Sequence, residues 1–481
     1  MRVLPSRPRL VVLALALVAC LGCALVAAPL ADLAGLWAPH TYLVLAQNED
    51  ELRPTGGFIT GVAVVTLSGG RVTDMRLGDA NSVDDLHQAY PSPPDPLLRY
   101  MGSEMWLLRD ANWSPDFPTS ARQAAALYQL GQGVHIDGVA AFDEAALQSL
   151  LAVTGPVSVP GLSQPVTSAN FLTLLRAAWS AAPGTTQAAT WRTQRKDFMG
   201  PLAKALLAQL KSVRDPRTVL ALAAAARAAL DQHHVLVYLP GGTSLSNLLA
   251  RNGWDGAVSP GSQDYLRVVD ANIGFNKVNA AIDESLSYRV DLTNPAQPSA
   301  SLTVAYTSTV ATPKACVDFG VANHSTQYSD YLQDCYWDYW RVLLPAGARV
   351  LSAPRNAVPG SELLSGQADD NPAQVTTGEA GTTEVAGVFV LPTTQTKATQ
   401  LRYNLPATVI ARSAGSQAAY RLRVQKQPGT GALPLDVTIA YPAGWTIKST
   451  STPVRASTPG ETQFSLNLET DIDFEAVFNT P

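Results

Sequence analysis

An uncharged run of 22 residues, Leu10 to Ala31, follows a short N-terminal stretch with three arginines. As a helix rising about 1.5 Å per residue, such a run can cross a bilayer core of roughly 30 Å. The basic residues before the run and Asp32 after it place the start of the chain in the cytoplasm and the body outside. The sequence therefore predicts a cytoplasmic tail at 1–9 and a single transmembrane anchor at 10–31.

Two other interpretations of this run stay open. A cleaved signal peptide has the same order of basic and apolar residues, although its apolar part is usually shorter. The stretch Leu17-Val18-Ala19-Cys20 is similar to a bacterial lipobox, which would make the protein a lipoprotein attached at Cys20. In each case the body of the chain lies outside the cytoplasm.

Two cysteines, Cys316 and Cys335, lie in the body of the chain. A disulfide between them is permitted outside the cytoplasm. It would close a loop of about 20 residues and stabilise the fold by about 3 kcal/mol. Two free buried thiols are the alternative, and we expect the disulfide.

Charge and length limit the classes of protein that fit. The net charge is -5, and the body contains no run of Lys and Arg. Because binding to phosphate backbones needs a basic surface, we expect no nucleic-acid partner. A chain of 481 residues, 46% of them hydrophobic, predicts two or three folded domains.

The hydrophobic pattern changes near residue 283. Residues 41–282 combine strand patterns, such as 58–67, with helical patterns such as 144–153, and this mixture predicts an α/β domain. Residues 283–481 contain short runs such as SYRVDL, WRVLL and YRLRV between Pro, Gly, Ser and Thr. That spacing predicts an all-β sandwich region. One module and two modules are both compatible with it.

Arg53-Pro54-Thr55-Gly56-Gly57 follows the first predicted strand. A guanidinium beside glycine amides suits an anionic oxygen of phosphate or carboxylate. We therefore take Arg53 as a catalytic candidate and Thr55, Gly56 and Gly57 as ligand-binding candidates. A hairpin turn with a surface arginine is the alternative.

The tripeptide Asp-Ala-Asn occurs three times, beginning at Asp79, Asp110 and Asp270. Asp and Asn favour turns and helix caps, which alone could explain the triplets. The functional alternative is that their oxygens hold Mg²⁺ or sugar hydroxyls. This hypothesis makes Asp79 and Asp270 metal-ligand candidates. It adds Asp110 and Arg109 as catalytic candidates, and the ligand-binding candidates Asn112, Asn272 and Lys277.

Five motifs carry a family resemblance: TYLVLAQNEDELRPTGGFITG, LRDANWSPDFPTSAR, RNGWDG, VVDANIGFNKVN and YRLRVQKQPGTG. Together they resemble a family of bacterial membrane-anchored proteins known as domain of unknown function 4012. The resemblance runs over nearly the whole chain after the anchor. No activity follows from it.

The region from Thr41 to Pro160 is also similar, in the order of its elements, to the LytR-CpsA-Psr phosphotransferases. That resemblance implies a membrane-anchored protein that moves glycopolymers from polyprenyl pyrophosphate onto peptidoglycan. It implies arginines on the pyrophosphate, acidic residues on Mg²⁺ and a lipid tail in an apolar tunnel. Arg53 falls at the first arginine of that family, and Asp79 falls near its Arg-Asp pair, where this chain has Gly78 instead of arginine.

Two functional hypotheses follow. In the first, the protein binds a polyprenyl-pyrophosphate-linked glycan in the cell envelope, and its catalytic version transfers that glycan with Mg²⁺ as cofactor. In the second, it is a non-catalytic envelope scaffold, or a protein that binds wall polymer or a partner, and the same polar residues brace its core.

Overall fold

The computed structural model describes residues 27–180, 199–317, 325, 327–413 and 416–481. The predicted tail at 1–9, most of the predicted anchor and Cys20 lie outside these residues. Within the described ranges, no helix is long and apolar enough to cross a membrane. The anchor at 10–31 therefore stays a prediction.

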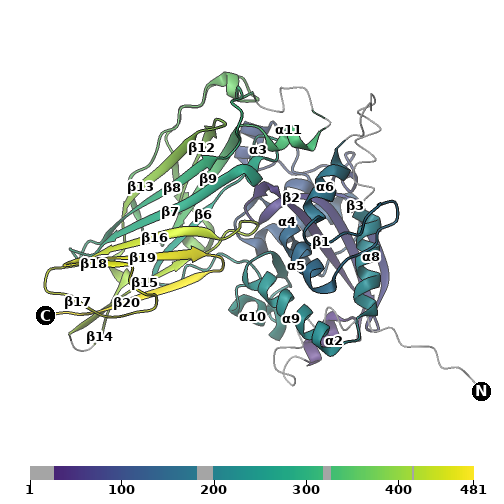
Figure 1. Ribbon diagram of the computed structural model, residues 1–481, viewed down its shortest axis with the longest axis horizontal. Helices are drawn as coiled ribbons and strands as arrows, with labels where there is room; N and C mark the ends of the chain where they lie inside the picture. Colours follow the sequence, from purple (N-terminus) through teal and green to yellow (C-terminus); the bar gives the residue numbers. More distant parts are fainter. Residues whose placement is uncertain (1–26, 181–198, 318–324, 326, 414–415) are drawn as a thin grey trace, which may run out of the picture.

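The N-terminal part is an α/β domain, on the right in Figure 1. Its sheet has the strand order β3-β2-β1-β4-β5. Only the β1–β4 pair is parallel. The strands span His40–Arg53 (β1), Gly56–Ser68 (β2), Arg71–Asp79 (β3), Gly138–Phe142 (β4) and Val235–Tyr238 (β5).

Helices surround this sheet, and the helical pattern predicted at 144–153 is confirmed by a helix at Glu144–Thr154. Asp143 caps α5 as its position predicts, because its side chain accepts a hydrogen bond from the amide of Ala146. The described α-helices are Ala27–Leu33 (α2), Asp95–Met101 (α3), Phe117–Gln132 (α4), Glu144–Thr154 (α5), Phe171–Trp179 (α6), Met199–Ser212 (α8), Pro216–Asp231 (α9), Ser244–Arg251 (α10) and Tyr328–Leu332 (α11). The 3-10 helices are Ala80–Ser82 (η1), Leu108–Trp113 (η2), Val278–Ala281 (η3), Gly360–Glu362 (η4), Glu379–Gly381 (η5) and Ala407–Val409 (η6).

The C-terminal part is a sandwich of two large sheets, on the left in Figure 1. One sheet has the order β10-β13-β8-β7-β16-β19-β18, and the other has the order β11-β12-β9-β6-β15-β20-β17 with β14 beside β15. The strands are Asp264–Val269 (β6), Ile282–Asp291 (β7), Ser299–Ser308 (β8), Tyr336–Leu344 (β9), Arg349–Ser352 (β10), Gln374–Thr377 (β11), Thr383–Leu391 (β12), Thr396–Asn404 (β13), Ile410–Ser413 (β14), Gln417–Val424 (β15), Leu433–Ala440 (β16), Thr446–Thr450 (β17), Ala456–Thr458 (β18), Glu461–Leu468 (β19) and Ile472–Asn479 (β20).

One continuous hydrophobic core lies between these two sheets, with residues from β6 to β20. The predicted order of an α/β domain and then an all-β region is confirmed. The strand β6 lies before the predicted boundary at 282/283, yet it pairs with β9 and β15 of the sandwich. All six of its residues are buried, including the charged Asp264 and Arg267, as in a central strand. Its partners are too far along the sequence to be seen in a local pattern.

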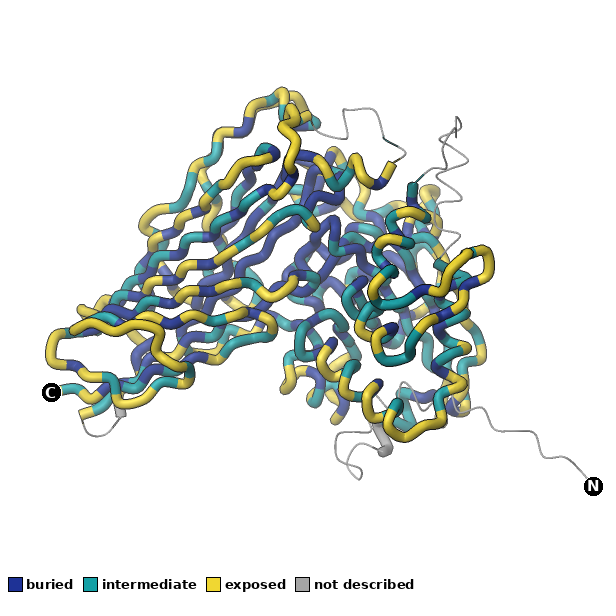
Figure 2. Tube along the Cα trace, in the orientation of Figure 1, coloured by how far each residue is buried: buried dark blue, intermediate teal, exposed yellow. Residues whose placement is uncertain are grey.

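The two parts pack closely against one another. Figure 2 shows buried segments continuing from the sandwich into the α/β domain where the two meet. The amide group of Gln427, in the loop after β15, donates to the carbonyls of Arg53 and Asp270 at 3.1 and 2.7 Å. The end of β1 is therefore held by both parts of the molecule.

Candidate functional site at the end of strand β1

The last residues of β1 carry an unusual density of charge. The pairing of β1 with β2 slips between Asn48, opposite Phe58, and Leu52, opposite Gly57. This bulge takes Glu49, Asp50 and Glu51 out of the regular ladder. Their carboxylates can therefore point to places that a regular strand would not reach.

The Arg53 side chain is fully buried and bound within the protein. Its Nη2 lies 3.0 Å from Glu51 Oε1 and 3.6 Å from Asp110 Oδ1, and its Nη1 donates to the carbonyl oxygen of Asn272. The guanidinium also lies 5.2 Å from the centre of the Phe58 ring. With an exposure of 0%, Arg53 does not lie on a surface where it could contact phosphate directly.

Lys277 lies in the same cluster. Its Nζ is 2.5 Å from Glu51 Oε2 and 5.3 Å from the centre of the Phe58 ring. Glu51 therefore binds Arg53 through one oxygen and Lys277 through the other. The two cations brace the junction, which is the role that the second hypothesis gives them.

The loop with the second Asp-Ala-Asn triplet reaches the same place through η2. The Arg109 Nε lies 3.5 Å from Asp110 Oδ2, and its Nη1 donates to Asn81 Oδ1 at 3.0 Å. Asn112 donates to the carbonyl oxygen of Gly57 at 2.9 Å. Burial raises the pKa of Asp110, against the opposing effect of Arg53 and Arg109. The structure thus brings Arg53, Arg109 and Asp110 together.

The glycines after Arg53 make room for the chain itself. A Cβ at Gly57 would lie 2.0 Å from the backbone carbonyl of Asn48, and one at Gly56, where φ is +130°, would meet the side chain of Gln47. The backbone of Gly56 also packs against Gly429. The hydroxyl of Thr55 is buried and has no hydrogen-bond partner among the described residues. Close packing against Gln47, Asn48 and Gly429 therefore explains why glycine occupies positions 56 and 57, without a bound ligand.

The three triplets have different roles. Asp79 caps η1 by accepting a hydrogen bond from the amide of Asn81 at 2.8 Å, which is turn chemistry. The second and third triplets both contact Arg53, through Asp110 and Asn272. Asn272 also donates to Asn276 and Asn279.

Asp79 and Asp270 do not share a ligand set in the described chain. Asp270 accepts a hydrogen bond at 2.9 Å from the hydroxyl of Tyr306, which belongs to strand β8 of the sandwich. Across the residues that the structure describes, no group of three or more His, Cys, Asp or Glu side chains could hold a metal ion. Asp79 and Asp270 therefore do not fit a shared Mg²⁺ site. Binding of Mg²⁺ elsewhere in the protein stays a prediction.

Next to this cluster is an acidic cavity of about 280 Å³ between the two parts of the protein. Asp50 lines it and is bound by Arg176 at 2.7 and 2.9 Å and by the Tyr328 hydroxyl at 2.7 Å. The other acidic side chains that line it are Glu49, Glu144, Asp270 and Glu284. Burial raises the pKa values of these four carboxyls. Glu49, Glu144, Arg176 and Glu284 are not among the candidates from the sequence, because nothing local marks them as neighbours.

Residues 38–179 match the model of the family described as "Protein of unknown function (DUF4012)". The predicted resemblance to this family is confirmed over these residues, which hold the first two of the five motifs, and the match does not extend to the other three. No curated protein matches the chain.

Solved structures similar in fold include a LytR-Csp2A-Psr enzyme from Actinomyces oris. It has 16% identity, a TM-score of 0.29, and coverage of 45% of this chain and 75% of the other. TagV of B. subtilis has 12% identity, a TM-score of 0.29, and coverage of 45% and 80%. An M1 zinc metallopeptidase from Deinococcus radiodurans has 12% identity, a TM-score of 0.21, and coverage of 41% and 42%. Likeness at these scores carries no functional argument.

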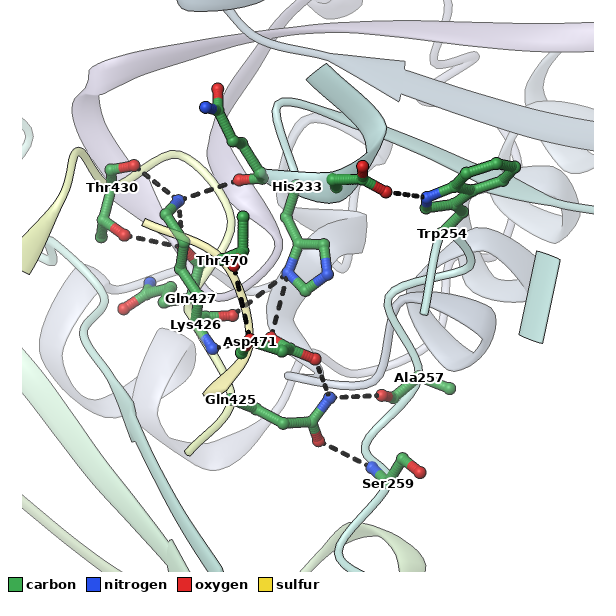
Figure 3. Close-up of polar contacts among 12 residues, drawn as sticks. His233, Trp254, Ala257, Ser259, Gln425, Lys426, Gln427, Thr430, Thr470 and Asp471 are labelled. Carbon is green, nitrogen blue, oxygen red and sulfur yellow. Dashed lines mark hydrogen bonds and ion pairs between the residues drawn. The ribbon is translucent and has the colours of Figure 1, made fainter. Parts of the chain in front are cut away.

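The segment that matches DUF4012 supplies one side of the site, including Arg53, Asp110 and Glu144. Asp270, Asn272, Lys277 and the loop after β15 come from outside that segment. Figure 3 shows how this loop is held: Lys426 Nζ donates to the carbonyl oxygens of Gln232, Gln427 and Thr430 at 3.0, 3.3 and 2.6 Å. Burial lowers the pKa of Lys426 to about 8.

His233 also contacts the loop that holds Lys426, as Figure 3 shows. Its Nδ1 lies 3.4 Å from the carbonyl oxygen of Lys426 and 3.8 Å from Asp471 Oδ1. Its backbone has a φ of 60°, which is rare for a residue with a Cβ. Lys426 lies in YRLRVQKQPGTG, one of the five motifs that carry the family resemblance, and the motif alone gives this lysine no role. A lysine that binds backbone carbonyls leaves no pattern in the sequence.

The DUF4012 segment also borders an apolar cavity of about 530 Å³ between α5, α8 and α9. Phe142, Leu147 and Leu150 line one side, and the alanines of α9 line the other. Two exposed cations, Lys211 and Arg214, also line it. The cavity thus combines an apolar wall with positive charge.

Proposed function

We propose that this protein acts in the bacterial cell envelope and binds an amphiphile with an isoprenoid chain and an anionic phosphate head, as in a polyprenyl-pyrophosphate-linked glycan. The apolar cavity between α5, α8 and α9 carries this proposal. Its volume of about 530 Å³ lies in the range of roughly 300–1,000 Å³ that ligand pockets have. The resemblance to LytR-CpsA-Psr proteins supports it, because it implies an apolar tunnel for a lipid tail.

Small side chains create this cavity. α5 and α9 pack against each other, and Ala223, Ala226 and Ala229 of α9 line the space together with Ala146 of α5. Large aliphatic side chains at these positions would fill it. The chain contributes Lys211 and Arg214 as partners for the phosphate, since both line the cavity and are exposed to solvent.

We propose binding without transfer. In the catalytic hypothesis Arg53 contacts the pyrophosphate, yet its guanidinium is buried and bound by Glu51, Asp110 and the Asn272 carbonyl. The carboxylates of the neighbouring cavity would also repel a pyrophosphate.

We further propose that the chain is anchored by residues 10–31 with its body outside the cytoplasm. The Cys316–Cys335 disulfide supports this, because such bonds persist in oxidising compartments. Protease added to intact protoplasts should remove nearly the whole chain, and full protection would contradict this topology. A mobility shift on reduction, lost in Cys316→Ser, should reveal the disulfide.

The test of lipid binding compares two substitutions on α9. Ala226→Trp fills the cavity, whereas Ala224→Trp puts the same side chain on the exposed face. Binding of geranylgeranyl phosphate to the detergent-purified full chain is measured by calorimetry. Wild type and Ala224→Trp should bind, and Ala226→Trp should not. Ala223→Leu serves as a milder second variant if Ala226→Trp does not fold.

Lys211→Ala and Arg214→Ala together should weaken binding of the phosphate but leave geranylgeraniol, the uncharged alcohol, unaffected. Equal binding to Ala226→Trp and wild type would reject the cavity as the site. Mass spectrometry of lipids that copurify with the protein identifies the natural amphiphile.

A groove of about 260 Å³ on the sandwich favours a second candidate function, binding of wall glycan by a non-catalytic protein. Hydroxyl, amide and charged groups line it, among them Ser301, Thr303, Gln463 and Arg455. Such groups suit a polyhydroxylated ligand. Sedimentation with purified peptidoglycan should be lost in Thr303→Trp, and retention of binding in that variant would exclude this groove.

A further inference from the structure

The acidic cavity has walls from both parts of the protein. Glu49 and Asp50 come from the bulge of β1, and Glu144 is the first residue of α5. Asp270 and Glu284 come from the sandwich side. A molecule in this cavity would therefore contact the α/β domain and the sandwich at once.

Two of these carboxylates have unmet hydrogen-bonding capacity. The side chain of Glu144 is only 6% exposed, and among the described residues its carboxylate has no hydrogen bond or ion pair. Glu284 Oε1 is also buried and accepts no hydrogen bond from a donor in the described structure. Its neighbour is the carboxyl of Asp270, with which it can form a hydrogen bond only when one of the two is protonated. They line the cavity from opposite parts of the molecule.

The other carboxylates of the cavity differ, because the protein binds them. Asp50 is held by Arg176 and Tyr328. Glu49 accepts a hydrogen bond from the backbone amide of Glu144 at 3.0 Å, and Asp270 accepts one from Tyr306.

Positive charge is scarce in this cavity. Among the described lining residues the only cationic side chain is Arg176, and it forms an ion pair with Asp50. The positive charge of Lys277 lowers the pKa of Glu144 from nearby, but the Nζ of Lys277 is bound to Glu51. Burial and repulsion between neighbouring carboxylates raise the pKa values of Glu144 and Glu284. Buried carboxylates of this kind are strongly stabilised by a cation that also donates hydrogen bonds.

We propose that this cavity binds a small organic cation with ammonium groups, held between Glu144 and Glu284. An ammonium group donates three hydrogen bonds, which two buried carboxylates can accept, and Tyr306 and Tyr336 also line the space. A directly bound metal ion fits less well, since the described residues offer no metal-holding group of three acidic, His or Cys side chains. The site is independent of the amphiphile cavity.

The test uses 1,4-diaminobutane as the probe and the full chain purified in detergent. Calorimetry and thermal unfolding are carried out at pH 7.5 and constant ionic strength. We expect one equivalent to bind and to raise the melting temperature. The uncharged 1,4-butanediol should do neither, and neither should CaCl₂ or MgCl₂ alone.

The matched variants separate a site from general charge effects. The double variant Glu144→Gln, Glu284→Gln should bind the diamine about tenfold more weakly or not at all. Without diamine it should melt at a higher temperature than wild type, because burial opposes the ionisation of both carboxyls in the folded chain, whereas the unfolded chain ionises them freely at pH 7.5. Glu104→Gln with Asp283→Asn changes the net charge equally on exposed residues, and it should bind like wild type.

Equal diamine binding in both double variants would overturn the proposal, and so would no binding to wild type. Stabilisation by a metal salt but not by the diamine would also overturn it. Geranylgeranyl phosphate binding is measured in the same variants and should be unchanged, so failure of this proposal is distinguishable from failure of the amphiphile site.

Discussion

Arg53 and Arg109 contact the same carboxylate, that of Asp110, from different environments. Arg53 is 0% exposed, whereas the Arg109 side chain is 38% exposed. Removing Arg53 leaves the buried Glu51 with Lys277 alone and the buried Asp110 with only the partly exposed Arg109 as cationic partners. Arg53→Ala should therefore lower the free energy of unfolding by about 3–5 kcal/mol. Arg109→Ala should lower it by about 1 kcal/mol or less, because water screens an exposed pair.

Urea unfolding of the purified full chain measures both changes. Arg53→Lys is a useful third variant, since it keeps the charge but cannot bind Glu51, Asp110 and the Asn272 carbonyl together. Its stability should fall between those of wild type and Arg53→Ala. Similar, small losses in Arg53→Ala and Arg109→Ala would contradict the bracing role of Arg53.

At the scale of single elements, two helices of the α/β domain begin at aspartate caps in different surroundings. Asp215 caps α9 on the surface by accepting hydrogen bonds from the amide and hydroxyl of Thr218. Asp116 caps α4 in the same way through Thr119, and its second oxygen accepts the amide of Val258 at 3.0 Å. Asp215→Ala should cost about 1 kcal/mol of stability. Asp116→Ala should cost about 1–3 kcal/mol more, because it leaves the Val258 amide without its partner.

Thermal or urea unfolding of the two variants gives this difference directly. Asp116→Asn is the control, because its side-chain oxygen can still cap the helix. Equal losses in Asp116→Ala and Asp215→Ala would mean that the link to Val258 adds nothing.

The same elements show how far the sequence predicts the structure. Periodicity predicts β2 through the pattern at 58–67 and α5 through the pattern at 144–153, because those patterns are local. Thr119 and Ser120 are of residue types that favour a cap as much as Asp116 does, yet Asp116 caps α4 and the helix begins at Phe117. The bulge of β1 and the sandwich pairing of β6 depend on partners distant in sequence, so local patterns do not reveal them.

For the candidate site too, the sequence points to some residues but not to how they pair. The sequence makes Arg53, Arg109 and Asp110 catalytic candidates, and the structure places the three side chains in contact. It could not predict that Glu51 binds both Arg53 and Lys277. Which charges pair depends on the tertiary fold. Thus residues selected for phosphate chemistry are bound to one another.

At the scale of the whole molecule, many carboxyl groups are buried at the junction and in the sandwich. Burial raises the pKa values of Glu49, Glu144, Asp270, Glu284 and Asp338 above their ordinary values. A folded-state pKa above the unfolded one means that the folded chain holds its proton to a higher pH. Each group therefore contributes a loss of stability as the pH rises from its unfolded to its folded pKa.

Asp264 allows this effect to be measured on one group. Its carboxylate is fully buried and accepts hydrogen bonds from Tyr288, Tyr420 and the amide of Tyr265. Burial outweighs these bonds and raises its pKa from 3.8 to about 6. Between about pH 4 and pH 6 the unfolded chain loses this proton while the folded chain keeps it, so stability falls by roughly 3 kcal/mol across the window. In urea unfolding at a series of pH values, Asp264→Asn should lack this part of the slope, whereas the exposed control Asp283→Asn should keep it. Parallel pH curves for Asp264→Asn and wild type would show that Asp264 is already ionised near pH 4 in the folded chain.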